Sequence, residues 1–82
     1  MNVRERAAQA ERLTADSAFQ ALIQDVRNDA ISQFLNSEPS DTEARDEAHA
    51  MVRALEKIEG RLEAYVDAFK IEQHKDRHRG ND

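Results

Sequence analysis

Residues 41–73 read DTEARDEAHAMVRALEKIEGRLEAYVDAFKIEQ, and this stretch decides the fold. Its apolar residues recur at alternating spacings of four and three. A repeat of about 3.5 residues is typical of a helix packed along another helix, as in a coiled coil. We therefore predict a helix over residues 41–73, roughly 48 Å long from the helical rise per residue. The residues of the repeat, which form the predicted seam, are Ala44, Ala48, Met51, Leu55, Ile58, Leu62, Tyr65 and Phe69.

The clearest turn in the chain precedes this helix, at residues 36–40 (NSEPS). Its proline disfavours helical geometry at the residue before it. Ser40 with Glu43 fits a capping box, and Asp41 adds negative charge at the positive end of the helix dipole. If Ser37 is the cap instead, the helix begins earlier and the proline lies in its first turn. A turn this short makes the two flanking helices antiparallel neighbours.

A second amphipathic helix is predicted over residues 17–35. A wide apolar stripe of this kind can pack against two neighbours at once. The stripe contains Phe19, Ile23, Val26, Ala30 and Phe34, and it is flanked by Leu22, Ile31 and Leu35.

A short amphipathic helix is predicted over residues 3–13. It is followed by Thr14-Ala15-Asp16-Ser17, and three of these four residues are of types that favour caps over helix interiors. Asp16 is the preferred N-cap of the following helix, and Ser17 with Gln20 is a competing capping box. Because no glycine or proline intervenes, one unbroken helix over residues 3–35 is the alternative.

Residues 74–82 (HKDRHRGND) offer no apolar anchor, so we predict a polar, flexible tail after a single domain of residues 1–73. His74 and His78 would share one face of a helix and could bind zinc if a third ligand joined them. A solvated, charge-rich tail is the simpler interpretation. Weak, sequence-independent contacts to nucleic-acid phosphates are the remaining possibility for three tail cations, namely Lys75, Arg77 and Arg79.

Composition excludes several classes of function. The chain has 82 residues, no cysteine and a net charge of −5. No segment approaches the roughly 18 apolar residues of a membrane span, and residues 1–12 lack a signal-peptide stretch, so a cytoplasmic location without membrane partners is expected. Residues 36–69 carry nine acids and four bases, a balance that repels nucleic acid.

Catalytic and cofactor-binding motifs are absent from the sequence. The carboxylates of residues 41–73 lie mostly outside the predicted seam, where water would surround them and general acid–base chemistry would lack a shielded pocket. We therefore expect no enzymatic activity, no cofactor and no bound metal. His49 is interpreted as a residue of the helix surface. Gly60 is interpreted as a tolerated surface glycine, with close approach of another chain as the alternative.

Three segments carry a family resemblance. An Arg6-Ala7-Ala8 opening leads to LTADSAF at residues 13–19, DTEARDE at residues 41–47 starts a helix, and ALEKIEGRLE at residues 54–63 lies in the last one. Together they resemble a loose group of small helical proteins that tailed bacteriophages and prophages encode near head-assembly genes. This chain departs from the group at Ser17, where a proline is usual, and at Phe34, where a tryptophan is usual. The resemblance covers residues 6–70 and implies a virion or assembly setting without a defined activity.

The sequence thus predicts an all-α helical hairpin, with a short N-terminal helix and a long heptad-patterned C-terminal helix, completed by oligomerisation or a partner. We expect a non-enzymatic structural or assembly protein of the phage head, in the bacterial cytoplasm or the virion. The alternative is a small acidic regulator or inhibitor that binds a host or phage protein. The predicted interface with itself or with a larger phage assembly protein consists of Ala48, Met51, Leu55, Ile58, Leu62, Tyr65, Phe69, Phe19, Ile23, Val26 and Phe34.

Overall fold

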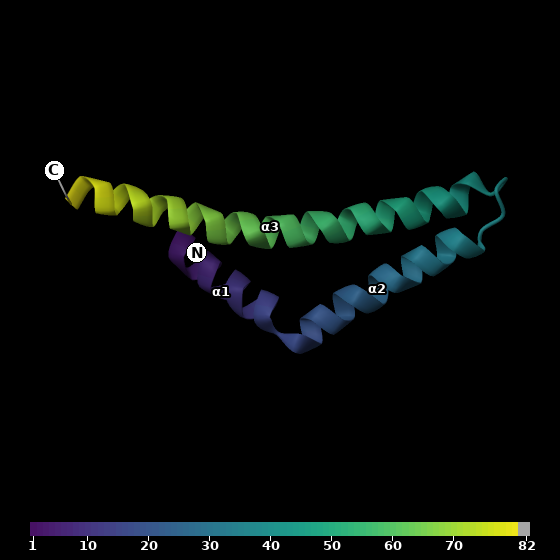
Figure 1. Cartoon of the computed structure of the whole chain (residues 1–82), viewed down its shortest axis with the longest axis horizontal. Helices are drawn as coiled ribbons and strands as arrows, with labels where there is room; N and C mark the ends of the chain where they lie inside the picture. Colours follow the sequence, from purple (N-terminus) through teal and green to yellow (C-terminus); the bar gives the residue numbers. More distant parts are fainter. Residues whose placement is uncertain (81–82) are drawn as a thin grey trace.

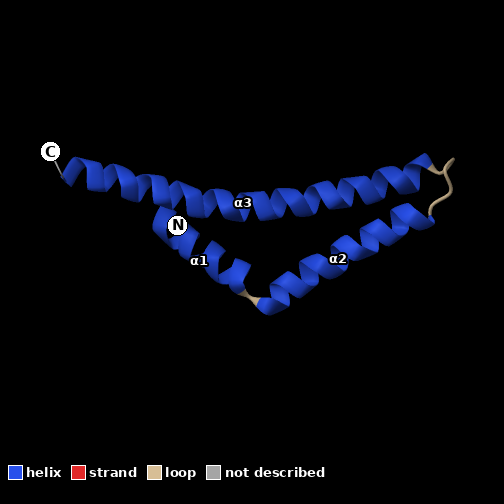
Figure 2. Cartoon of the chain, in the orientation of Figure 1, coloured by secondary structure: helices blue, strands red, loops and turns tan. Residues whose placement is uncertain are grey.

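The computed structural model describes the backbone of residues 1–80 and the side chains of residues 1–76. Residues 1–80 form three helices and no strand, namely α1 (Val3–Ala15), α2 (Ser17–Asn36) and α3 (Thr42–Gly80) (Figure 2). The prediction of an all-α fold with a short first and a long last helix is confirmed. The molecule is elongated, with principal extents of 63 × 24 × 18 Å.

The three helices form a shallow triangle whose long side is α3 (Figure 1). α1 begins beside the later part of α3 and leads away from it to the bend at Asp16. From the bend, α2 approaches α3 again and lies antiparallel to it near the turn. Both α1 and α2 pack mainly on α3 and only slightly on one another. We call α1 and α2 together the arm, because they form an angled unit that lies against α3.

The bend between α1 and α2 is held by Asp16, whose backbone is extended at φ −75° and ψ 119°. The N–H of Phe19 donates to Asp16 Oδ1 at 2.9 Å, which is the hydrogen bond of an N-cap. The side-chain amide of Gln20 donates across the bend to the carbonyl of Thr14 at 2.6 Å. The predicted break and the predicted cap are confirmed, whereas the unbroken helix and the cap at Ser17 were wrong.

The start of α3 corrects the predicted cap. The N–H of Ala44 donates to Asp41 Oδ1 at 3.0 Å, so Asp41 rather than Ser40 is the N-cap. The charged carboxylate both accepts this bond and complements the positive end of the helix dipole. Ser37 instead closes the end of α2, where its hydroxyl donates to the carbonyl of Phe34 at 2.6 Å.

The end of α3 corrects a second prediction. The helix continues to Gly80, so the predicted helix end at about Gln73 was wrong, while the flexibility of the polar tail stays a prediction. Beside this part of the helix, residues 2–4 line a small cavity together with α3 residues between Phe69 and Asp76. The rest of the predicted tail, residues 81–82, lies outside the described residues.

The core consists mostly of alanine, and its two large residues are Ile23 of α2 and Leu55 of α3. Ala30 of α2 and Ala48 of α3 are buried near the turn, and Ala7 and Ala10 are buried in α1. Small side chains allow helix axes to approach closely. Within residues 1–76, the buried hydrophobic residues are Ala7, Ala10, Ile23, Ala30, Ala48 and Leu55.

Candidate protein-interaction surfaces

Some residues of the predicted seam of α3 are buried between the helices, and others are exposed. Leu55 is 5% exposed, and Met51 and Ile58 are each 46% exposed. Val52, which lies beside the seam in the sequence, is half-buried. The members of the seam that are buried or half-buried are Ala44, Ala48, Leu55, Leu62, Tyr65 and Phe69.

The reason for this division is that α3 packs against two helices in succession. A strict heptad assumes one partner along the whole seam, but α2 contacts the first part of α3 and α1 the later part. The contact is consequently rotated toward Val52 and Val66, and it leaves Met51 and Ile58 outside. These two residues are seven apart, so they share one face of the helix. We name them the outer face of α3.

The apolar stripe of α2, like the seam of α3, is only partly buried. Ile23 is buried, and Phe19 and Val26 are half-buried. Phe34 is partly exposed, and the guanidinium of Arg45 lies 4.3 Å from the centre of its ring, a cation–π contact that joins α2 to α3. The flanking residues Leu22, Ile31 and Leu35 are exposed.

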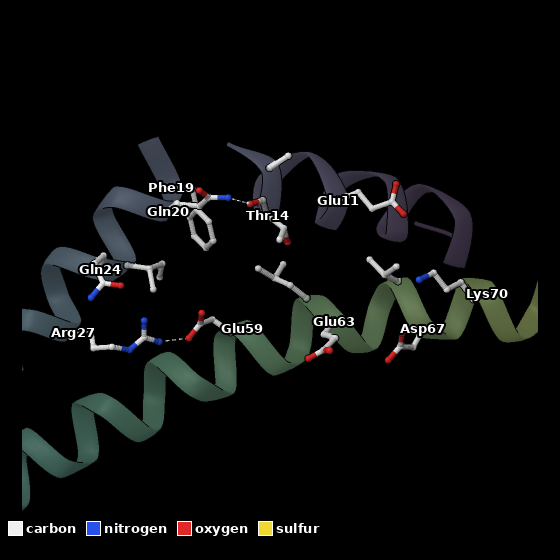
Figure 3. A pocket seen from close by; sticks show the side chains of 14 residues that line it. Glu11, Thr14, Phe19, Gln20, Gln24, Arg27, Glu59, Glu63, Asp67 and Lys70 are labelled. Carbon is white, nitrogen blue, oxygen red and sulfur yellow. Dashed lines mark hydrogen bonds and ion pairs between the residues drawn. The ribbon is translucent and has the colours of Figure 1, made fainter. Parts of the chain in front are cut away.

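A groove of about 730 Å³ lies between the bend and α3 (Figure 3). Its apolar lining comes from Ala15, Phe19 and Ile23 on the arm and from Leu62 and Val66 on α3. The groove lies where the chain bends at Asp16, and there α1 and α2 cover this part of α3 incompletely. Groove-lining residues labelled in Figure 3 include Glu11 and Thr14 on α1, Gln20 and Gln24 on α2, and Glu63, Asp67 and Lys70 on α3.

The charged groups that line this groove are mainly acidic. The lining contains four carboxylates and two cations. One of the carboxylates, Glu59 of α3, forms an ion pair with Arg27 of α2. The remaining charged residues of the lining are Glu11, Glu63, Asp67 and Lys70. An apolar lining with an acidic rim is a surface that can bind a peptide or helix.

Several other predictions bear on chemistry. Among the described side chains, no three His, Cys, Asp or Glu residues gather as a metal site. His74 lies in α3, and the side chains of His78, Arg77 and Arg79 lie outside the described residues. Within residues 1–80 no helix combines the length and the apolar content that crossing a bilayer requires.

Gly60 and His49 both lie on the surface of α3. A Cβ atom added at Gly60 would meet nothing within 4 Å. No other part of this chain therefore needs the space that the glycine leaves. His49 is exposed, as the sequence predicted.

The groove was not predicted from the sequence, although its parts were visible there. The caps around Asp16 indicated a bend, and Phe19, Ile23 and Leu62 were among the predicted apolar positions. The missing information was the direction of the bend, which depends on how α1 returns to α3. Comparison with protein-family models, curated proteins and solved structures found no match for the chain.

Proposed function

We propose that this chain is a non-enzymatic structural or assembly protein that acts through helix–helix contacts, first of all with a second copy of itself. The observation that carries the proposal is the distribution of its large apolar residues. Within residues 1–76 only Ile23 and Leu55 among them are buried. Ten others are exposed, namely Met1, Val3, Leu13, Leu22, Ile31, Phe34, Leu35, Met51, Ile58 and Ile71.

A second copy is the occupant that best fits the outer face of α3. Exposed apolar surface on an elongated helical hairpin is commonly covered in a two-fold dimer that closes a four-helix bundle. Met51 and Ile58 stand two helical turns apart on the longest helix, so the same pair on a second chain can pack against them in antiparallel fashion. Contiguous exposed apolar patches are uncommon on proteins that stay monomeric.

Sedimentation at several concentrations tests this association. The native chain should be a dimer or larger, and the double variant Met51→Gln/Ile58→Gln should be a monomer with nearly unchanged helix content, because both side chains are exposed in the single chain. Ile71→Gln is the matched control, since Ile71 is exposed on the same helix and belongs to another face. A native chain that sediments as a compact monomer of 9.4 kDa at every concentration would contradict the proposal.

The setting that we propose for this association is the head of a tailed bacteriophage. Its support is the resemblance of residues 6–70 to small helical proteins encoded near head-assembly genes. Mass spectrometry of phage particles and head precursors induced from a lysogen that encodes the chain should detect it in one of the two. Its absence from both would contradict the proposed phage-head setting. The proposed self-association would be unaffected by that result, because sedimentation tests it separately.

A second candidate function rests on charge. Residues 36–69 carry nine acids and four bases, which favours a small acidic regulator that docks on a basic surface of another protein. Such docking weakens steeply with added salt, whereas apolar self-association tolerates it. Binding that disappears between low and physiological salt would favour the regulator over the structural protein.

A further inference from the structure

We propose that the groove at the bend binds one amphipathic helix of another protein, a helix whose apolar face is flanked by lysine or arginine. This inference deepens the proposed function, because it rests on the same capacity for helix–helix contact and names the chemistry of a partner. It concerns a surface separate from the outer face of α3, since neither Met51 nor Ile58 lines the groove.

The first argument is the apolar lining. Phe19, Leu62 and Val66 are half-buried by this chain alone, and they line a space of about 730 Å³ that none of its own helices fills. Water in a groove lined by such side chains gains little hydrogen bonding, so an apolar occupant is favoured there.

The second argument is the length of the groove. Its α3 side extends from Glu59 to Lys70, which corresponds to roughly 17 Å from the helical rise per residue. A length of this size matches about three turns of a bound helix, with apolar anchors on one face at a spacing of three and four residues. The arm on the other side is itself helical on both flanks of Asp16, so the occupant would lie among three helices.

The third argument is charge, and it selects the partner. Glu63 and Asp67 lie one turn apart along α3, and Glu11 lies on the α1 side of the same groove (Figure 3). After Arg27 has paired with Glu59, Lys70 is the one cation of the described lining outside that pair, against three carboxylates. Cationic residues on both edges of a bound helix would complement them.

The same charges disfavour nucleic acid as an occupant, because its phosphates would meet the carboxylates of the lining. The groove, unlike the apolar outer face of α3, therefore selects a cationic partner.

A pair of synthetic peptides tests the partner chemistry on the intact protein. Both peptides are helical and about four turns long, with leucine on one face, and the leucines are flanked by lysine in one peptide and by glutamate in the other. Isothermal titration calorimetry at low salt should show binding of the lysine peptide and binding weaker by on the order of tenfold or more for the glutamate peptide. Equal affinities, or no binding of the lysine peptide, would overturn the proposal.

Two double variants of equal charge locate the site. Glu63→Lys/Asp67→Lys reverses two rim carboxylates, and Asp46→Lys/Glu56→Lys reverses two exposed carboxylates on the same helix outside the groove. Because both variants change the net charge by the same amount, general attraction of a cationic peptide is held constant. The rim variant should lose on the order of tenfold in affinity and the control less than about threefold. Equal losses would overturn the assignment to the groove.

The outer-face variant separates this proposal from the proposed function. Met51→Gln/Ile58→Gln should bind the lysine peptide as tightly as the native chain even where it no longer self-associates. If that variant loses the peptide, the peptide binds the outer face and the groove assignment is overturned. If peptide binding fails while the native chain dimerises, the proposed function stands without the groove.

Discussion

The ends of the arm and its middle are built from side chains of different size. At the ends the arm contacts α3 through alanines, whereas at the bend the facing residues are large. Small residues let helix axes approach, and large residues that interdigitate incompletely leave space between them. The comparison teaches that this chain buries small side chains at the ends of the arm, whereas three of the four large side chains at the bend stay half-buried. The alanines at the ends are Ala7, Ala10, Ala30 and Ala48, and the large residues at the middle are Phe19, Ile23, Leu62 and Val66.

The largest effect should come from truncating leucine in the packed part of α3. Leu55 is buried, so Leu55→Ala should lower the free energy of unfolding by about 2–5 kcal/mol. Leu62 is half-buried beside the groove, and Leu62→Ala should lose about half as much or less. Urea titration followed by circular dichroism measures both. Equal losses would mean that the side chains beside the groove are packed as tightly as Leu55.

An oversized side chain at one end tests the same comparison from the opposite direction. Ala48 is 1% exposed, so Ala48→Leu should overpack the contact near the turn and cost about 1–3 kcal/mol. Ala64→Leu on the exposed side of α3 is the matched control, which should change stability by less than about 0.5 kcal/mol. An unchanged free energy of unfolding for Ala48→Leu would show that the helices near the turn can move apart to admit a larger side chain.

The cap of α3 gives a smaller effect at the same end. Asp41→Ala removes the acceptor for the N–H of Ala44 and should cost about 1 kcal/mol. Ser40→Ala should leave the thermal midpoint nearly unchanged, because the Ser40 side chain does not cap the helix. A larger loss of stability for Ser40→Ala than for Asp41→Ala would indicate that Ser40 is the N-cap, as the sequence predicted.

The smallest effect is expected at Gly60, on the outside of α3. A Cβ atom there meets nothing within 4 Å, so Gly60→Ala should stabilise the helix by about 0.5–1 kcal/mol through backbone entropy. Thermal melting of the two proteins under identical conditions measures the gain. Destabilisation, or loss of the proposed self-association, would indicate that another chain approaches the glycine closely.

Local signals in the sequence were sufficient to predict the elements of the fold. The cap at Asp16 and the proline turn set helix ends that the structure reproduces within about two residues for α1, α2 and the start of α3. Information that depends on distant residues was missing. Residues 2–4 share a cavity with the later part of α3, which continues to Gly80.

The candidate surfaces were predicted in part for the same reason. Spacing alone grouped Met51 and Ile58 with Leu55, although one partner helix along the entire seam was an assumption. Because α3 packs against two helices in succession, Met51 and Ile58 are exposed and Leu55 is buried. The groove needed the direction of the bend at Asp16, which no local pattern contains.

The dependence of α1 on α3 has a consequence for the order in which the molecule opens. α1 makes few contacts with its neighbour α2, and its Arg6 lies 5.0 Å from the ring centre of Tyr65, far along the chain. Contacts between distant residues require closure of a long loop, whereas the α2–α3 hairpin closes through a short turn. We expect the hairpin to fold first and α1 to detach first, with its amides exchanging with deuterium faster than those of α2. Each such opening would also remove one wall of the groove.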